Sequence, residues 1–267
     1  MAAEERSQTD LKTHLAHPAR VYDYWLGGKD NYAADREVAW KIMAIAPDTP
    51  RSAQANRQFL KRAVLLAAER GIRQFLDIGS GLPTVENTHE VAQLVAPDAH
   101  VAYVDNDPIV RAHGKALLAD CTTRTVVQAD VREPEAILAH PDVRKLIDFD
   151  RPVAVLLLGV LHFVSDEEDP YGIVARIREA MAPGSYLIFS HLTGDADTQT
   201  FEQTREATDR RWSSVARTRE EVERFFSGFE ILEPGIVPPD RWRPDGPERM
   251  ERFWLWAGVG VKRSEMA

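Results

Sequence analysis

Aspartate and glycine residues recur at the ends of three short apolar runs, and their spacing suits a nucleoside ligand. The first run carries Asp77 and leads into a turn with Gly79, Ser80 and Gly81. Two glycines in such a turn let the backbone pass close to a ligand, because no Cβ stands in the way. The second run ends at Asp105, 26 residues after Gly79. A carboxylate there can accept hydrogen bonds from both ribose hydroxyls of an adenosine.

The third apolar run extends this pattern to the base. It ends near Asp130, 25 residues beyond Asp105. Its carboxylate can accept a hydrogen bond from an adenine amine, and the amide of Val131 can donate to a ring nitrogen. Asn106 directly follows Asp105 and is assigned to the same site. Ligands of open α/β sheets bind beyond the carboxyl ends of the strands, so we expect these residues to face one cofactor.

The residues after the glycine turn favour an adenosine ligand without phosphates. A dinucleotide fingerprint needs a third glycine where this chain has Thr84, and its helix N-terminus binds a pyrophosphate. Here Glu86 and Glu90 follow the turn, and both would repel phosphate. S-adenosylmethionine carries a sulfonium and an ammonium, which Asp77 or backbone carbonyls can hold. An oxidoreductase with a nicotinamide or flavin dinucleotide is the less favoured alternative.

A histidine follows the fourth apolar run, 153–160, and is the candidate catalytic residue. An imidazole with an ordinary pKa of about 6.5 can take a proton from an attacking hydroxyl or amine. The alternative is that His162 only packs or hydrogen-bonds beneath the cofactor, because methyl transfer can proceed by proximity and alignment alone. Gly159 is expected on the floor of the cofactor site. His191, at the end of the fifth run, is assigned to the substrate side.

Polar residues of the N-terminal segment are further candidates. Tyr24 and Asn31 flank a double glycine, Gly27 and Gly28, which allows close approach to a ligand. We assign Tyr24 and Gly28 to the cofactor and Asn31 to the substrate, although the aromatic residues can equally dock the segment on a sheet. Asn56 and Arg57 are also placed on the substrate side, where an arginine binds a carboxylate or pairs with a neighbouring acid.

Hydrophobic periodicity predicts the elements that position these residues. After Gly71, short apolar runs are separated mostly by helical patterns, which predicts a doubly wound, mostly parallel α/β sheet. The expected strands span 74–78, 100–105, 124–128, 153–160, 186–191, 229–236 and 253–261. The last two are joined without a helical pattern, so an antiparallel hairpin is expected to end this seven-stranded sheet.

The periodicity before Gly71 is helical throughout. Helices are expected over 18–26, 35–46 and 53–70, each stopped by a glycine or proline. We therefore expect an N-terminal helical cap over residues 1–70 and a cofactor-binding domain over residues 71–267. The two should close into one functional unit.

Composition narrows the classes of partner. The 267 residues carry a formal net charge of -9, which disfavours a sequence-independent grip on nucleic acid. The longest apolar stretch, 153–161, falls short of the about 20 residues that span a membrane. The polar N-terminus lacks a secretory pattern, and Cys121 alone builds neither an intrachain disulfide nor a cysteine zinc cage. We expect a cytoplasmic protein with a small-molecule substrate, no metal, and no membrane or nucleic-acid partner; the oligomeric state stays open.

Several segments resemble a known enzyme class. The strand-tip residues with the terminal hairpin resemble class I S-adenosylmethionine-dependent methyltransferases from about Gly71 onward. More specifically, four segments resemble a bacterial family of S-adenosyl methyltransferases formerly catalogued as a domain of unknown function: RVYDYWLGGKDNY (20–32), ANRQFLKRAV (55–64), FLDIGSGLPTVENTHEVA (75–92) and YVDNDP (103–108). The chain departs from the class I pattern at Pro83, where many members have a third glycine.

The resemblance implies a Rossmann-like methyltransferase fold and S-adenosylmethionine as cofactor. It implies transfer of a methyl group to an oxygen, nitrogen or carbon of a small molecule, with S-adenosylhomocysteine as product. A non-catalytic regulatory protein that binds S-adenosylmethionine is the alternative, because His162 is an ambiguous base and no other clear base is present in the sequence.

Overall fold

The computed structural model describes residues 12–83, 86–117, 122–208, 214–246 and 250–263. Thr84 and Cys121, on which two of the sequence arguments rest, lie outside these ranges. The described strands form one seven-stranded sheet in the order β3-β2-β1-β4-β5-β7-β6. Strands β1 to β5 run parallel, and β7 is antiparallel to both β5 and β6. The predicted doubly wound sheet with an antiparallel end is confirmed.

Several strands begin and end where the sequence predicts. The strands are β1 (Gln74–Ile78), β2 (His100–Asp105), β3 (Arg124–Gln128), β4 (Ala154–Leu158), β5 (Tyr186–Leu192), β6 (Phe229–Ile231) and β7 (Leu255–Lys262). β6 is shorter than the predicted 229–236, because the chain turns where the Gly235 amide donates to the Leu232 carbonyl. Val237 then returns to form an isolated bridge with Ala257 of β7.

Helices precede the sheet and fill the connections between its strands. The N-terminal helices are α1 (Pro18–Trp25), α2 (Ala33–Ile45) and α3 (Thr49–Glu69). Those in and after the parallel part are α4 (Thr88–Gln93), α5 (Pro108–Leu117), α6 (Pro134–Ala139), α7 (Pro141–Leu146), α8 (Pro170–Ala180), α9 (Thr198–Ala207) and α10 (Arg219–Arg224), with short 3-10 turns η1 (Leu161–Phe163), η2 (Asp166–Glu168) and η4 (Pro239–Arg241). Helix α9 was not expected from the sequence. None of the described helices has the length and apolarity of a membrane span.

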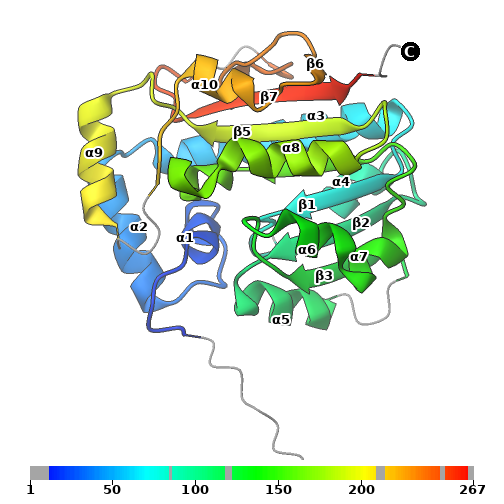
Figure 1. Ribbon diagram of the computed structural model, residues 1–267. Coiled ribbons are helices and arrows are strands. Elements are labelled where there is room, and N and C mark those ends of the chain that lie inside the picture. Colours follow the sequence, from blue (N-terminus) through cyan, green and yellow to red (C-terminus); the bar gives the residue numbers. More distant parts are fainter. Residues whose placement is uncertain (1–11, 84–85, 118–121, 209–213, 247–249, 264–267) are drawn as a thin grey trace, which may run out of the picture.

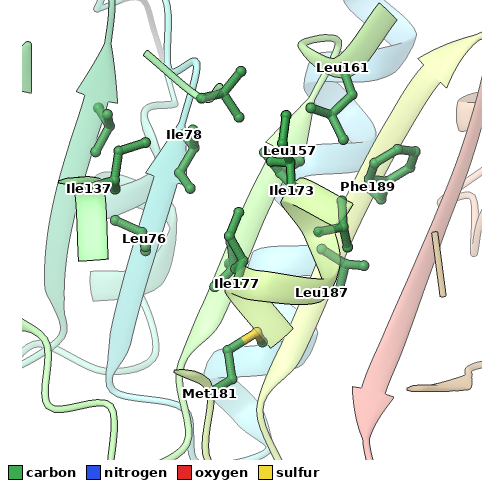
Figure 2. Close-up of a cluster of buried hydrophobic side chains, with 14 of the residues drawn as sticks. Leu76, Ile78, Ile137, Leu157, Leu161, Ile173, Ile177, Met181, Leu187 and Phe189 are labelled. Carbon is green, nitrogen blue, oxygen red and sulfur yellow. The ribbon is translucent and has the colours of Figure 1, made fainter. Parts of the chain in front are cut away.

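Two apolar layers hold the sheet between helices. On one face, strand residues pack against α6 and α8, and Figure 2 shows the cluster: Leu76, Ile78, Leu157, Leu187 and Phe189 with Ile137, Ile173, Ile177 and Met181. On the other face, α3 packs through Phe59 and Val64 against Phe75, Val101 and Leu156. Both faces are buried, which explains why the strands read as continuous apolar runs.

A buried ionic network ties the N-terminal helices to the end of β2. Arg20 of α1 is 3% exposed, and its Nε lies 3.2 Å from Asp107 Oδ2. Its Nη1 lies 3.5 Å from Oδ2 of the fully buried Asp35 in α2, and its Nη2 donates to the Leu15 carbonyl. Asp107 stands two residues beyond Asp105. The strand tip that carries a predicted cofactor residue is therefore anchored to the N-terminal helices.

Candidate active site

A cavity of about 500 Å³ opens at the carboxyl ends of β1, β2, β3 and β4. Helices α1, α2, α3 and α9 contribute further walls, and Figure 1 shows the arrowheads of β1, β3 and β5 pointing toward the side where α1, α2 and α9 lie. Most of the predicted site residues line this cavity, namely Asp77, Gly79, Ser80, Gly81, Asp105, Asn106, Asp130, Val131, Gly159, Asn56, Arg57 and His162.

The glycine turn after β1 needs its glycines for two different reasons. Gly79 has φ +72°, and a Cβ on it would lie 2.1 Å from Val160 Cγ2. Gly81 has φ +66°, but a Cβ on it would meet nothing within 4 Å. The amides of Gly79 and Ser80 donate to the Val104 carbonyl of β2. Gly79 thus packs the turn onto the sheet, while Gly81 leaves the backbone open to the cavity.

Asp105 holds the glycine turn and keeps capacity for a ligand. Its Oδ2 accepts from the Gly81 amide at 2.8 Å, and its Oδ1 accepts from the Asp107 amide at 2.9 Å. Burial raises the pKa of this carboxyl, and these two hydrogen bonds partly offset the rise. A carboxylate has about four lone-pair sites. Two acceptor sites therefore remain for a pair of ligand hydroxyls.

Asp77 is a buried carboxylate on the cavity wall. Its Oδ2 accepts from Thr88 Oγ1 at 2.6 Å. Burial raises the pKa of Asp77 to about 6, against the opposing effects of the Thr88 hydrogen bond and the positive charge of Arg57. A nearby positive charge stabilises the ionised form of a buried carboxyl, so a cationic ligand group would offset the cost of burying this anion. The site is therefore suited to an ammonium.

Asp130 is held more tightly than the sequence suggested. Its carboxylate accepts from Asn106 Nδ2 at 3.1 Å and from the amide and Nη1 of Arg132 at 3.0 and 3.1 Å. Burial acts to raise the pKa of Asp130, but the hydrogen bonds and charge from Arg132 and Asn106 outweigh it and lower the pKa below its ordinary value. Arg132 also donates to Glu168 Oε1 at 2.5 Å and to the Phe163 carbonyl at 2.7 Å. This arginine, which the sequence analysis missed, links the tips of β3 and β4.

His162 and Asn56 meet beside Gly159 at the tip of β4. A Cβ on Gly159 would lie 3.6 Å from His162 Cε1 and 3.9 Å from Asn56 Nδ2. The amide nitrogen of Asn56 donates to Tyr22 Oη at 3.2 Å, whereas its Oδ1 and the Nδ1 of His162 are buried without a hydrogen-bond partner. Burial, helped by the positive charge of Arg217, lowers the pKa of His162 well below its ordinary value. The cavity floor therefore carries a neutral imidazole.

His191 does not reach the cavity, which corrects its assignment to the substrate side. It is fully buried, and its Nδ1 donates to the Leu192 carbonyl at 2.8 Å. Its Nε2 accepts from Nη1 of Arg217 at 2.8 Å, and Arg217 Nη2 donates to Asp166 Oδ1 at 2.6 Å. Burial lowers the pKa of His191 to about 3. The side chain serves as a neutral acceptor for a buried arginine.

Three residues of the N-terminal segment also lie outside the cavity, and their assignments are corrected. Tyr24 accepts a hydrogen bond from Trp40 Nε1 at 2.6 Å. Asn31 donates from Nδ2 to Asp23 Oδ2 at 2.9 Å. A Cβ on Gly28 would lie 1.9 Å from Asp23 Oδ1, so this glycine makes room for that carboxylate. These contacts stabilise the loop after α1.

Comparison with known proteins decides the family. A family model described as S-adenosyl methyltransferase matches residues 4–263. The chain belongs to the S-adenosyl methyltransferase family. This confirms the resemblance found in the sequence, and the cofactor of this methyltransferase is S-adenosylmethionine. Searches of curated proteins give no match.

Solved structures support the same fold for this methyltransferase. A Thermobifida fusca protein assigned as a methyltransferase is 48% identical, over 95% of this chain and 97% of that chain, with a TM-score of 0.89. A DUF574 family protein of Streptomyces avermitilis is 43% identical, over 94% of this chain and 99% of that chain, with a TM-score of 0.89. The mitomycin 7-O-methyltransferase MmcR, 17% identical over 92% and 69% of the two chains with a TM-score of 0.50, shares the fold.

The corrected role of Gly28 gives a prediction. We expect Gly28→Ala to destabilise this methyltransferase by about 1–3 kcal/mol, because the added methyl group must displace Asp23. Cofactor affinity of the folded variant should stay unchanged. Thermal unfolding and calorimetry with S-adenosylhomocysteine measure the two effects. Gly246→Ala is the matched control, since a Cβ there meets nothing within 4 Å. Loss of affinity with unchanged stability would restore Gly28 to the cofactor site.

Proposed function

We propose that this methyltransferase transfers the methyl group of S-adenosylmethionine to a small molecule enclosed between the sheet and the N-terminal helices. One observation carries the proposal: a single cavity joins the strand-tip carboxylates to a space beneath α1, α2 and α9. A cofactor bound at the strand tips would direct its methyl group toward an acceptor in that space. The net charge of -9 also favours a small molecule over a nucleic acid.

The residues of the cavity fit the cofactor. We assign Asp105 to the ribose hydroxyls, since both of its oxygens keep an acceptor site. The open backbone at Gly81 and the buried Asp77 carboxylate suit the methionine part, whose ammonium is cationic. Asp130 and the Val131 amide are assigned to the adenine. Because Arg132 and Asn106 already donate to Asp130, that carboxylate should contribute less than Asp105.

The chemistry supplied by the bound cofactor is an electrophilic methyl group: an acceptor lone pair forms the new bond to carbon, the carbon–sulfur electron pair returns to sulfur, and the acceptor loses a proton to water. The chain contributes alignment. Asn56 and His162 border the tip of β4, where their unpartnered polar atoms can orient an acceptor hydroxyl or amine. The floor of the cavity thus positions the nucleophile.

We propose that His162 positions the acceptor rather than storing its proton. The lowered pKa leaves its imidazole neutral at physiological pH. A sulfonium nearby would disfavour the imidazolium further, since like charges repel. A neutral ring nitrogen still forms hydrogen bonds, and alignment alone can supply a large part of the rate enhancement.

We propose that residues 1–70 act as a cap on residues 71–267 within one functional unit. The Arg20 network supports this, because it joins α1 and α2 to the loop after β2. Contacts between α2 and α9 add a second junction, which brings distant parts of the chain together over the cavity.

Two measurements test the proposed function. Calorimetry should detect binding of S-adenosylhomocysteine, and absence of any heat or thermal shift would reject the cofactor site. Incubation with S-adenosylmethionine and a panel of small phenols, amines and activated carbon acids should then release S-adenosylhomocysteine. Binding without turnover across the panel would instead support the non-catalytic regulatory alternative.

The buried Asp77 predicts a pH dependence of cofactor binding. Its pKa of about 6 means that the carboxylate is mostly ionised at pH 7 and mostly protonated at pH 5. An ammonium binds the ionised form, so affinity should fall up to about 10-fold between pH 7 and pH 5. Calorimetry with S-adenosylhomocysteine measures this slope.

Asp77→Asn is the control for this pH dependence. Its amide cannot ionise. The affinity of this variant for S-adenosylhomocysteine should therefore be lower than that of the unaltered protein at pH 7 and should change little between pH 7 and pH 5. If Asp77→Asn kept the slope of the unaltered protein, another group would be responsible and our placement of the ammonium would be wrong.

A further inference from the structure

The space beneath the cap is largely apolar on the sides formed by α2, α9 and β7. We define the acceptor chamber by six lining residues, Trp25, Ile42, Ala46, Phe201, Trp254 and Leu255. They come from α1, from α2 and the residue that follows it, from α9, and from the first residue of β7 and the one before it. The described residues that α2, α9 and β7 contribute to the cavity include no acidic or basic side chain. A charged acceptor lying between these three elements would lose its hydration without gaining a counter-charge from them, which is costly.

Threonines on the chamber wall add little polarity. Thr49 Oγ1 donates to the Ala46 carbonyl at 2.7 Å, and Thr204 Oγ1 donates to the Phe201 carbonyl at 2.7 Å. Thr208 Oγ1 donates in the same way to the Arg205 carbonyl at 2.8 Å. Because each hydroxyl proton is used by its own segment of backbone, none of the three is left to donate to a ligand.

Two indole groups are the exception. Nε1 of Trp25 and Nε1 of Trp254 are both buried without a hydrogen-bond partner. An indole N–H only donates, and when buried it usually has an acceptor. Leaving such a donor unpaired costs about 1–3 kcal/mol. The chamber therefore offers two donors, from two separate elements, to acceptor atoms of a ligand.

The tip of β4 offers the complementary polarity. Asn56 Oδ1 can only accept a hydrogen bond, and it is buried without a partner, as is Nδ1 of His162; both side chains lie beside Gly159. A ligand hydroxyl can donate to either atom. The aromatic faces of Trp25, Phe201 and Trp254 favour ring contacts in between.

We propose that the methyl acceptor is a neutral, planar aromatic molecule with a phenolic hydroxyl directed toward Asn56 and His162 and carbonyl or ether oxygens directed toward Trp25 and Trp254. This inference rests on the proposed methyl transfer. The phenol oxygen forms the bond to the methyl carbon as the carbon–sulfur bond breaks, and the phenolic proton passes to water. A phenol is acidic enough to react without a strong base, whereas an alkyl alcohol is not, and this agrees with a neutral imidazole on the floor.

The test compares phenols of different charge on the protein saturated with S-adenosylhomocysteine. At about pH 6 umbelliferone, juglone and vanillin are neutral and carry carbonyl groups, whereas tyramine is cationic and para-hydroxybenzoate anionic. We expect at least one neutral probe to bind about 10-fold or more tightly than both charged ones, because burial of an unpaired charge is costly. With S-adenosylmethionine, that probe should yield its methyl ether.

Conservative variants identify the donors. Trp25→Phe and Trp254→Phe keep an aromatic ring but remove the N–H. Each should therefore weaken binding of the neutral probe about 5- to 10-fold. Affinity for S-adenosylhomocysteine should not change. Trp40→Phe is the matched control, because Trp40 is exposed and its N–H donates to Tyr24 outside the cavity; it should change neither affinity.

The outcomes separate the two proposals. If S-adenosylhomocysteine binds but the charged phenols bind as well as the neutral ones, or no neutral phenol binds, the acceptor class is wrong while the cofactor site stands. Unchanged probe binding in both indole variants would also overturn it. Failure of S-adenosylhomocysteine itself to bind would reject the proposed function.

Discussion

Replacing Asp105 with alanine is expected to weaken S-adenosylhomocysteine binding by about 100-fold, or about 2.7 kcal/mol. The variant removes the carboxylate that we assign to the two ribose hydroxyls. It also frees the amides of Gly81 and Asp107, which the carboxylate holds at 2.8 and 2.9 Å. The ligand therefore loses hydrogen bonds to a charged group, and the glycine turn loses the contact that fixes it against β2.

Calorimetry on folded protein measures this loss. The affinity of Asp105→Asn for S-adenosylhomocysteine should lie between those of Asp105→Ala and the unaltered protein, because the amide oxygen of the asparagine still accepts one of the hydrogen bonds. Asp98→Ala is the control, since that carboxylate is exposed and pairs only loosely with Arg73 at 3.6 Å. A folded Asp105→Ala protein with unchanged affinity would remove Asp105 from the ribose site.

Substitution of Arg20 by methionine should destabilise the fold by about 3–5 kcal/mol. The guanidinium is 3% exposed and lies between two buried carboxylates, Asp35 and Asp107. Removing one partner of a buried ion pair leaves the other charges without compensation. Backbone amides that donate to both carboxylates soften the loss but do not neutralise it.

Urea unfolding measures this effect on the free energy of unfolding. Arg51→Met is the matched control, because Arg51 is exposed on α3 and should change stability by less than about 0.5 kcal/mol. Arg20→Met should also weaken S-adenosylhomocysteine binding, since Asp107 belongs to the loop that follows Asp105. A loss below about 1 kcal/mol would mean that the cap does not depend on this network.

The parallel sheet was predictable because its signal is local. Strands β1 and β2 are buried on both faces and give short apolar runs, so they begin and end where the sequence indicates. Their acids converge because the carboxyl ends of parallel strands meet at one edge. Asp77, Asp105 and Asp130 therefore line one cavity although they are far apart in the chain.

The cap residues were harder to place, because helical periodicity does not say which face points inward. Tyr22 and Trp25 lie three residues apart, on one face of α1, and both line the cavity. Tyr24 lies on another face and contacts Trp40 instead. Choosing among these aromatics requires the packing of α1 on its neighbours, which no local pattern contains.

Helix α9 and Arg217 escaped prediction for related reasons. The sequence of α9, TQTFEQTREA, has a single large apolar residue, Phe201, so its periodicity is weak. Arg217 pairs with His191 and Asp166 across 26 and 51 residues of chain. It stands in an irregular segment beside β5, where neither helical nor strand periodicity marks a buried position.

The separate origin of the cavity walls bears on how such proteins diversify. Helices α2 and α9 contribute to the acceptor chamber and carry none of the cofactor residues that we assign, which stand on β1, β2, β3 and the turns that follow them. Substitutions at Ile42, Ala46, Phe201 or Thr204 can therefore reshape the chamber without altering a cofactor contact. Selection for a new acceptor can therefore act on residues of α2 and α9, while the residues assigned to S-adenosylmethionine stay the same.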